Sequence, residues 1–197
     1  MLQLDNPVCG KLNPSSGGGG AEDYFELASE ETTAKIQMYI KAIPQLDTSN
    51  ITNMVDMFKL CSSLIELPEL DTSNVTNMNC MFLSCSNLVS VPQLDASKVI
   101  NISNVLANCT SLTDFGGFLN LGEAYATGKS ANWYEYTLDL STCTNLTHDS
   151  LMNVINNLYD IKTKGCKAQS LKLGSTNLAK LTDEEIAIAT NKGWTVT

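Results

Sequence analysis

The segment Leu46-Asp47-Thr48-Ser49-Asn50-Ile51-Thr52-Asn53-Met54 recurs 24 residues later as Leu70-Asp71-Thr72-Ser73-Asn74-Val75-Thr76-Asn77-Met78. A weaker copy begins at Leu94-Asp95-Ala96-Ser97-Lys98-Val99, and the rest of the unit keeps the same phase. A unit of this length is too short to bury its own apolar face, whereas stacked units share one continuous core. The repeat therefore predicts a solenoid.

The whole unit follows the pattern Cys-x-x-Leu-x-x-Leu-Pro-x-Leu-Asp-Thr-Ser-Asn-Val-Thr-Asn-Met-x-x-Met-Phe-x-x-Cys. This pattern resembles the BspA-type leucine-rich repeats of bacterial surface proteins, and it is closest to the LDTSNVTNM…MF subclass of cell-surface and phage-associated proteins. The resemblance is strong over residues 44–121 and extends more loosely to the C-terminus. It implies an α/β leucine-rich-repeat solenoid with short strands, in which the Cys or Asn of each coil lies inside. Because that family is defined by its scaffold, the resemblance specifies fold more than function.

Two ladders of like residues follow from the repeat. One consists of Cys61, Cys85 and Cys109, and the other consists of Asp47, Asp71 and Asp95. Residues that share a phase are expected to stack roughly 5 Å apart. For the cysteines this predicts a buried structural ladder rather than a metal or redox centre. For the aspartates the neighbouring Ser and Thr favour local turn bonding over calcium binding, so we expect no metal and no cofactor.

The ends of the chain differ from the repeats. Residues 1–20 end in a Gly-rich stretch typical of a flexible tail and linker, and residues 21–44 are expected to hold a helix that caps the first coil. The solenoid is expected to span residues 45–197, with an insertion near 122–133. Beyond the insertion the pattern predicts a strand near 134–140, a helix capped by Thr147 or Asp149, and a strand at 170–173. Thr182 and Glu185 predict a capping box for a last helix, so that the C-terminal coils contain helices.

Composition narrows the possible functions. The 197 residues carry a net charge of −9 without a single arginine, which disfavours a nucleic-acid partner. There is one histidine, His148, and no serine or cysteine motif accompanies it, so we expect no enzyme activity. Residues 122–130 resemble a phosphate-binding loop but have five residues between the glycines where four are required. The sequence shows neither a signal peptide nor a run long enough to insert into a membrane.

Aromatic residues gather in and beside the insertion, where solenoids often bind their ligands. The candidate binding residues are Tyr125, Trp133, Tyr134 and Tyr136; the alternative is that these rings pack over the junction between the two kinds of coil. We expect a non-catalytic recognition or adhesion module of the bacterial cell-surface type. It would bind a protein or glycan on another cell or particle through the solenoid face or the aromatic insertion. Two alternatives are a phage or prophage tail-associated receptor-recognition protein and a structural spacer without a ligand. The expected location is extracellular, on the cell surface or on a virion.

Overall fold

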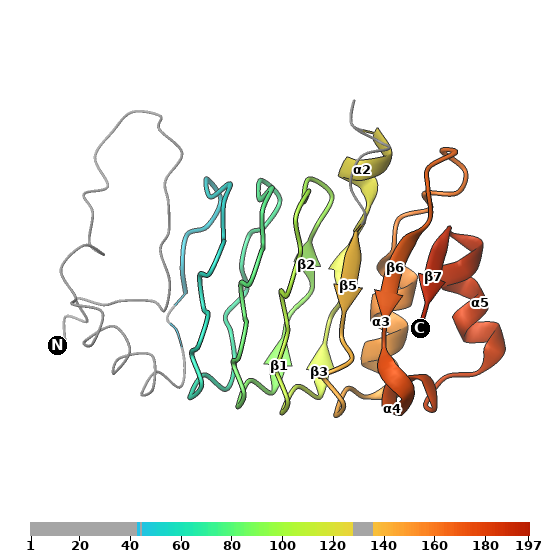
Figure 1. Ribbon diagram of the computed structural model, residues 1–197. Coiled ribbons are helices and arrows are strands. Elements are labelled where there is room, and N and C mark those ends of the chain that lie inside the picture. Colours follow the sequence, from blue (N-terminus) through green and yellow to red (C-terminus); the bar gives the residue numbers. More distant parts are fainter. Residues whose placement is uncertain (1–42, 44, 128–135) are drawn as a thin grey trace, which may run out of the picture.

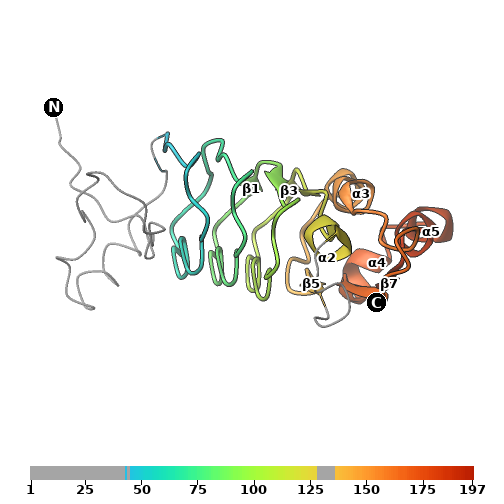
Figure 2. The ribbon, with the colours of Figure 1, turned by 90° about the horizontal axis from the view of Figure 1, so that it is seen from above.

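A computed structural model describes residues 43, 45–127 and 136–197 (Figures 1 and 2). Three 24-residue coils, at 46–69, 70–93 and 94–117, lie side by side and form what we call the coil stack. The tail at 1–20, the expected capping helix up to residue 42, and residues 128–135 of the insertion lie outside the described residues. Among the described residues no helix is long and apolar enough to span a membrane.

Equivalent residues of neighbouring coils pair in parallel. The strand β1 (Ser90–Val91) pairs with β3 (Asp114–Phe115), and β2 (Leu94–Asp95) pairs with β4 (Phe118–Leu119). On the other side of each coil, single bridges connect Asn53 to Asn77 and Asn77 to Asn101. Each of these partners is displaced by 24 residues, the period of the sequence repeat.

The turns of each coil use left-handed backbone conformations that repeat with the sequence. Two such positions occur in every coil, and they are occupied by Asp56, Cys80 and Asn104 and by Leu60, Ser84 and Asn108. Their φ angles lie between 54° and 63°. Asparagine tolerates this region, whereas leucine does so at a cost. The third coil is therefore the one whose residues best suit its turns.

The core of the coil stack is a column of repeated apolar side chains between the two sides. Met54, Met57 and Phe58 have no exposed surface, and neither do their equivalents Met78, Met81 and Phe82. The rings of Phe58 and Phe82 stack with centroids 5.4 Å apart and planes 7° from parallel. Complete burial of each such side chain stabilises the fold by about 1.5–3 kcal/mol.

The C-terminal part continues the stack with longer coils. A parallel sheet has the order β5 (Thr137–Asp139), β6 (Gln169–Lys172) and β7 (Trp194–Val196). The helices are α2 (Glu123–Thr127), α3 (His148–Asn157), α4 (Gly174–Leu178) and α5 (Asp183–Asn191). Seen from above, α3 lies on the same side as β1 and β3, whereas β5 lies on the opposite side (Figure 2).

The predicted helix caps of this part are confirmed. The side chain of Thr147 accepts a hydrogen bond from the backbone N–H of Ser150 at the start of α3. Thr182 and Glu185 form the reciprocal capping box at the start of α5. The strands predicted near 134–140 and 170–173 correspond to β5 and β6. Capping side chains thus predicted where α3 and α5 begin, even though the 24-residue period is lost in this part of the chain.

Candidate functional site

The two predicted binding tyrosines within the described residues lie inside the molecule, and this corrects the expectation of exposed anchors. Tyr125 and Tyr136 are each 5% exposed, with ring centroids 5.8 Å apart in an edge-to-face arrangement. The Tyr136 hydroxyl donates to the carbonyl of Val99, and burial raises the pKa of Tyr136. Alternation along β5 explains this placement, because Tyr136 shares its face with the buried Leu138 and Leu140. For these two rings the packing alternative holds; Trp133 and Tyr134 lie outside the described residues.

The cysteine ladder is buried, and the thiols of Cys85 and Cys109 bond to the preceding coil. Cys61, Cys85 and Cys109 have no exposed surface. The thiol of Cys85 donates to the carbonyl of Phe58 at 2.9 Å, and that of Cys109 donates to the carbonyl of Phe82 at 3.1 Å. Each acceptor lies three residues before the cysteine of the preceding coil. The ladder therefore satisfies backbone groups inside the stack.

The ladder continues beyond the three coils predicted to form it. Cys143 donates to the carbonyl of Leu106 at 3.2 Å. Asn177 takes the next position, and its side-chain N–H group donates to the carbonyl of Leu140 at 3.3 Å. Sequence reasoning did not identify Asn177, although it follows Cys143 by the same 34 residues that separate Cys143 from Cys109.

Burial also keeps the thiols of Cys85, Cys109 and Cys143 protonated at neutral pH. It raises the pKa of Cys85 to about 12 and that of Cys143 to about 11, and it raises the pKa of Cys109 as well. Since the thiolate is the reactive and metal-binding form, these side chains stay protonated and inert. Their arrangement supports a structural role.

The aspartate ladder is engaged in turns. An oxygen of Asp47 accepts from the backbone N–H of Ser49 at 3.1 Å and from its hydroxyl at 2.7 Å, and Asp71 does the same with Ser73. Asp95 accepts from the backbone N–H of Ser97 at 2.8 Å. The serine hydroxyl and backbone bonds lower the pKa of Asp47 and Asp71. Within the described residues no three His, Cys, Asp or Glu side chains are grouped to hold a metal ion.

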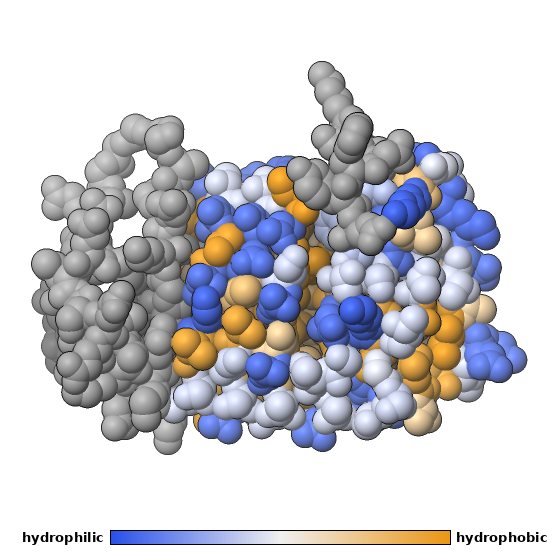
Figure 3. Space-filling model, in the orientation of Figure 1, coloured by the Kyte–Doolittle hydropathy of each residue, from blue (hydrophilic) through white to orange (hydrophobic). Residues whose placement is uncertain are grey.

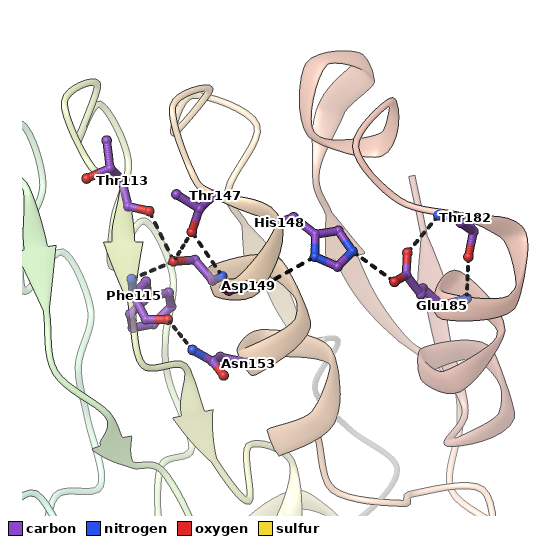
Figure 4. A network of polar contacts seen from close by, with 9 residues as sticks. Thr113, Phe115, Thr147, His148, Asp149, Asn153, Thr182 and Glu185 are labelled. Carbon is purple, nitrogen blue, oxygen red and sulfur yellow. Dashed lines mark hydrogen bonds and ion pairs between the residues drawn. The ribbon is translucent and has the colours of Figure 1, made fainter.

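The histidine joins two helices (Figure 4). Nε2 of His148, at the start of α3, lies 2.8 Å from Oε1 of Glu185 in α5. The other carboxylate oxygen of Glu185 accepts from the backbone N–H of Thr182 at 2.8 Å. Hydrogen bonds to Glu185 and then Asp149 raise the pKa of His148. The arrangement fastens α3 to α5.

The outward residues beside the asparagine bridges form parallel rows along the coil stack. We call them the ladder face: Asn50, Thr52, Asn74, Thr76, Lys98 and Ile100. Hydrogen bonds from the side chains of these rows connect one coil to the next. The side chain of Asn74 donates to the carbonyl of Ser49 at 2.8 Å, and Nζ of Lys98 donates to Oδ1 of Asn74 at 2.7 Å. In the second row, the hydroxyl of Thr76 donates to the carbonyl of Thr52 at 3.1 Å.

Exposed aliphatic residues lie on both sides of the coil stack. Ile100, on the ladder face, is 61% exposed and follows two threonines in its row. Val89 directly precedes β1 on the other side of the stack, and Ile65 is its equivalent in the preceding coil. Ile65 is 43% exposed and Val89 is 40% exposed. On the face shown in Figure 3, hydrophobic residues are scattered among hydrophilic ones over the coils. By its residues the ladder face is mainly polar, with the apolar Ile100 at one end.

Comparison with known proteins places the coil stack within one family model. Residues 28–123 match the family described as "Mycoplasma protein of unknown function, DUF285". That family is associated with BspA-type surface repeat proteins. Among curated proteins and among solved structures, none matches the chain. The part of the chain that holds the three coils is thus similar to the DUF285 family.

Proposed function

We propose that the chain is a BspA-type leucine-rich-repeat solenoid that acts as a non-catalytic recognition or adhesion module of the bacterial cell-surface type. In this proposal the ladder face binds a protein or a glycan on another cell or particle. The observation that carries the proposal is the pair of rows, Asn50-Asn74-Lys98 and Thr52-Thr76-Ile100, that coil-to-coil hydrogen bonds hold in place.

Rows of this kind suit recognition for a physical reason. Successive coils repeat at about 5 Å, so amide and hydroxyl groups are presented at a regular spacing. Binding usually requires the ordering of flexible side chains, which costs about 0.5–1.5 kcal/mol for each long one. Asn74 and Lys98 are already bonded to each other in the free protein, so part of this ordering precedes binding.

The arrangement of the chemically versatile side chains also favours binding over catalysis. Cys85, Cys109 and Cys143 are buried and bonded to carbonyls, and Asp47 and Asp71 are held in turns. These groups serve the scaffold. The exposed amides, hydroxyls and single aliphatic group of the ladder face are suited to contacts with polar ligands.

A matched pair of variants tests the proposal. The labelled full chain is applied to a microarray of bacterial and host glycans and to intact host cells, together with Ile100→Asp and Val89→Asp. Both changes place a carboxylate at an exposed aliphatic position, but only Ile100 lies on the ladder face. We expect saturable binding that Ile100→Asp weakens at least tenfold and Val89→Asp leaves unchanged. The absence of saturable binding to either target would contradict the proposal and favour a spacer. Equal losses in both variants would contradict the ladder face as the binding surface.

A further inference from the structure

The last strand of the C-terminal sheet leaves one edge without a partner strand in the described part of the protein. The sheet order β5-β6-β7 places β7 at the edge. Toward β6, the carbonyl of Gly193 accepts from Gln169, and the backbone N–H of Thr197 donates to Leu171 at 3.0 Å. Because backbone groups alternate in direction along a strand, those of Trp194 and Val196 point to the opposite edge.

A shallow pocket lies beside this edge. It is lined by residues 193–196, by Thr190 at the end of α5, and by Lys162, Cys166 and Ala168 from the loop before β6. Within the loop, the backbone N–H groups of Ile161 and Lys162 donate to the carbonyl of Lys192 at 2.9 and 3.1 Å. The loop is therefore fixed next to the start of β7, so that Lys162 lies close to this strand.

This end of the molecule has a charge opposite to that of the coil stack. Residues 160–172 contain four of the 12 lysines and one acid, Asp160, whose carboxylate accepts from the backbone N–H of Thr163 at 3.1 Å. Lys162 and Lys164 are exposed. By contrast, the coils at 46–117 contain seven acidic residues and two lysines.

We propose that the unpaired edge of β7 accepts an acidic, extended segment of another protein as an added strand, with Lys162 and Lys164 binding its carboxylates. Strand addition supplies backbone hydrogen bonds from the Val196 position, which is partly exposed, whereas Trp194 is buried. The lysines select an acidic partner and increase its rate of association. This site is at the end of the stack and is independent of the ladder face.

The test measures peptide binding to the full chain by fluorescence anisotropy at low ionic strength. The probe is a fluorescein-labelled, end-blocked heptapeptide of alternating glutamate and valine, and its counterpart has lysine in place of glutamate. We expect saturable binding of the acidic peptide only. Val196→Pro removes an outward N–H group without removing a bond to β6, so this variant is expected to lose binding while it stays folded.

Charge variants distinguish the effect of Lys162 and Lys164 on peptide binding from the effect of net charge. The double change Lys162→Ala and Lys164→Ala is expected to weaken binding about tenfold. Lys59→Ala is a control that removes one charge away from β7, because Lys59 lies at the other end of the stack and contacts the partly exposed Asp56. Failure of the acidic peptide to bind, equal binding of the lysine peptide, or full affinity in folded Val196→Pro would overturn the proposal. A dimer in sedimentation that Val196→Pro dissociates would overturn it too, since a second copy would then occupy the edge.

Discussion

Replacing Asn177 with leucine tests whether the internal ladder stabilises the long C-terminal coils. Asn177 has no exposed surface, and its side-chain N–H group lies within hydrogen-bond distance of the carbonyls of Leu140, Cys143 and Leu173 at 3.3, 3.2 and 3.1 Å. Its oxygen accepts from Nζ of Lys180 at 3.1 Å. Leucine preserves most of the volume and removes every one of these bonds.

The size of the effect follows from the number of donors. An amide carries two N–H bonds, and each makes a net contribution of about 1 kcal/mol. The carbonyls of Leu140 and Cys143 keep one bond each, from the backbone N–H groups of Cys143 and Leu146, and Lys180 keeps its bonds to Thr144 and Leu146. The carbonyls of Leu140 and Cys143 and the Lys180 ammonium are therefore not left unpaired. We expect Asn177→Leu to lower the free energy of unfolding by about 2 kcal/mol.

Two other substitutions at Asn177 give a graded series of stability losses. Asn177→Ala also opens a cavity and is expected to cost about 3 kcal/mol. Asn177→Cys keeps one donor of the kind found at Cys143 and is expected to cost about 1 kcal/mol. For a chain of this size, about 2 kcal/mol lowers the Tm by about 4–8 °C.

Urea unfolding followed by circular dichroism, together with a thermal scan, measures these differences. Asn87→Ala is the control, because Asn87 is exposed and its side chain makes no hydrogen bond within the described residues. We expect that change to stay within about 0.5 kcal/mol. If Asn177→Leu matched this control, or if Asn177→Cys were less stable than Asn177→Ala, the ladder would not be the stabilising element described above.

Three further predictions concern the turns, the histidine and the thiols. Leu60 has a φ of 63° and is 52% exposed, and Leu60→Asn, which copies Asn108, is expected to add about 0.5–1 kcal/mol of stability in urea unfolding; a loss of stability would refute the turn argument. Because the pKa of His148 is raised in the folded protein, its contribution is complete below about pH 6.5 and is lost as the pH rises through the raised value. His148→Gln should therefore reduce stability more at pH 5.5 than at pH 9, and an equal reduction at both values would count against the link to Glu185. Alkylation by iodoacetamide at pH 8, mapped by mass spectrometry, should modify the partly exposed Cys80 and Cys166 and spare Cys85, Cys109 and Cys143; labelling of the last three in the folded protein would show that the ladder opens.

Features that depend on neighbouring residues in the chain could be predicted from the sequence. The start of α5 follows from Thr182 and Glu185, which satisfy each other's backbone groups within four residues. The turns at Asp47 and Asp71 follow from serines two residues away. The burial of Cys85 and Cys109 follows from their shared phase in a repeat that must stack to form a core.

Features that depend on contacts across coils of unequal length could not be predicted. The hydroxyl of Tyr136 bonds to Val99, 37 residues earlier, and no repeat relates the two positions. The helix α4 has the sequence Gly-Ser-Thr-Asn-Leu, which has low helix propensity, and the bonds of Asn177 to other coils fix it in place. The unpaired edge of β7 appears only when the order of the sheet is known.

Removal of one complete coil tests the repeat architecture most directly. Deletion of residues 70–93 joins Glu69 to Leu94 and keeps every later residue in phase, whereas deletion of residues 70–81 removes half a period. We expect the first variant to unfold cooperatively in urea and to be about 5 Å shorter by small-angle X-ray scattering, and the second to have lost cooperative unfolding. Loss of cooperative unfolding in both variants, or its retention in both, would contradict a stack of interchangeable coils.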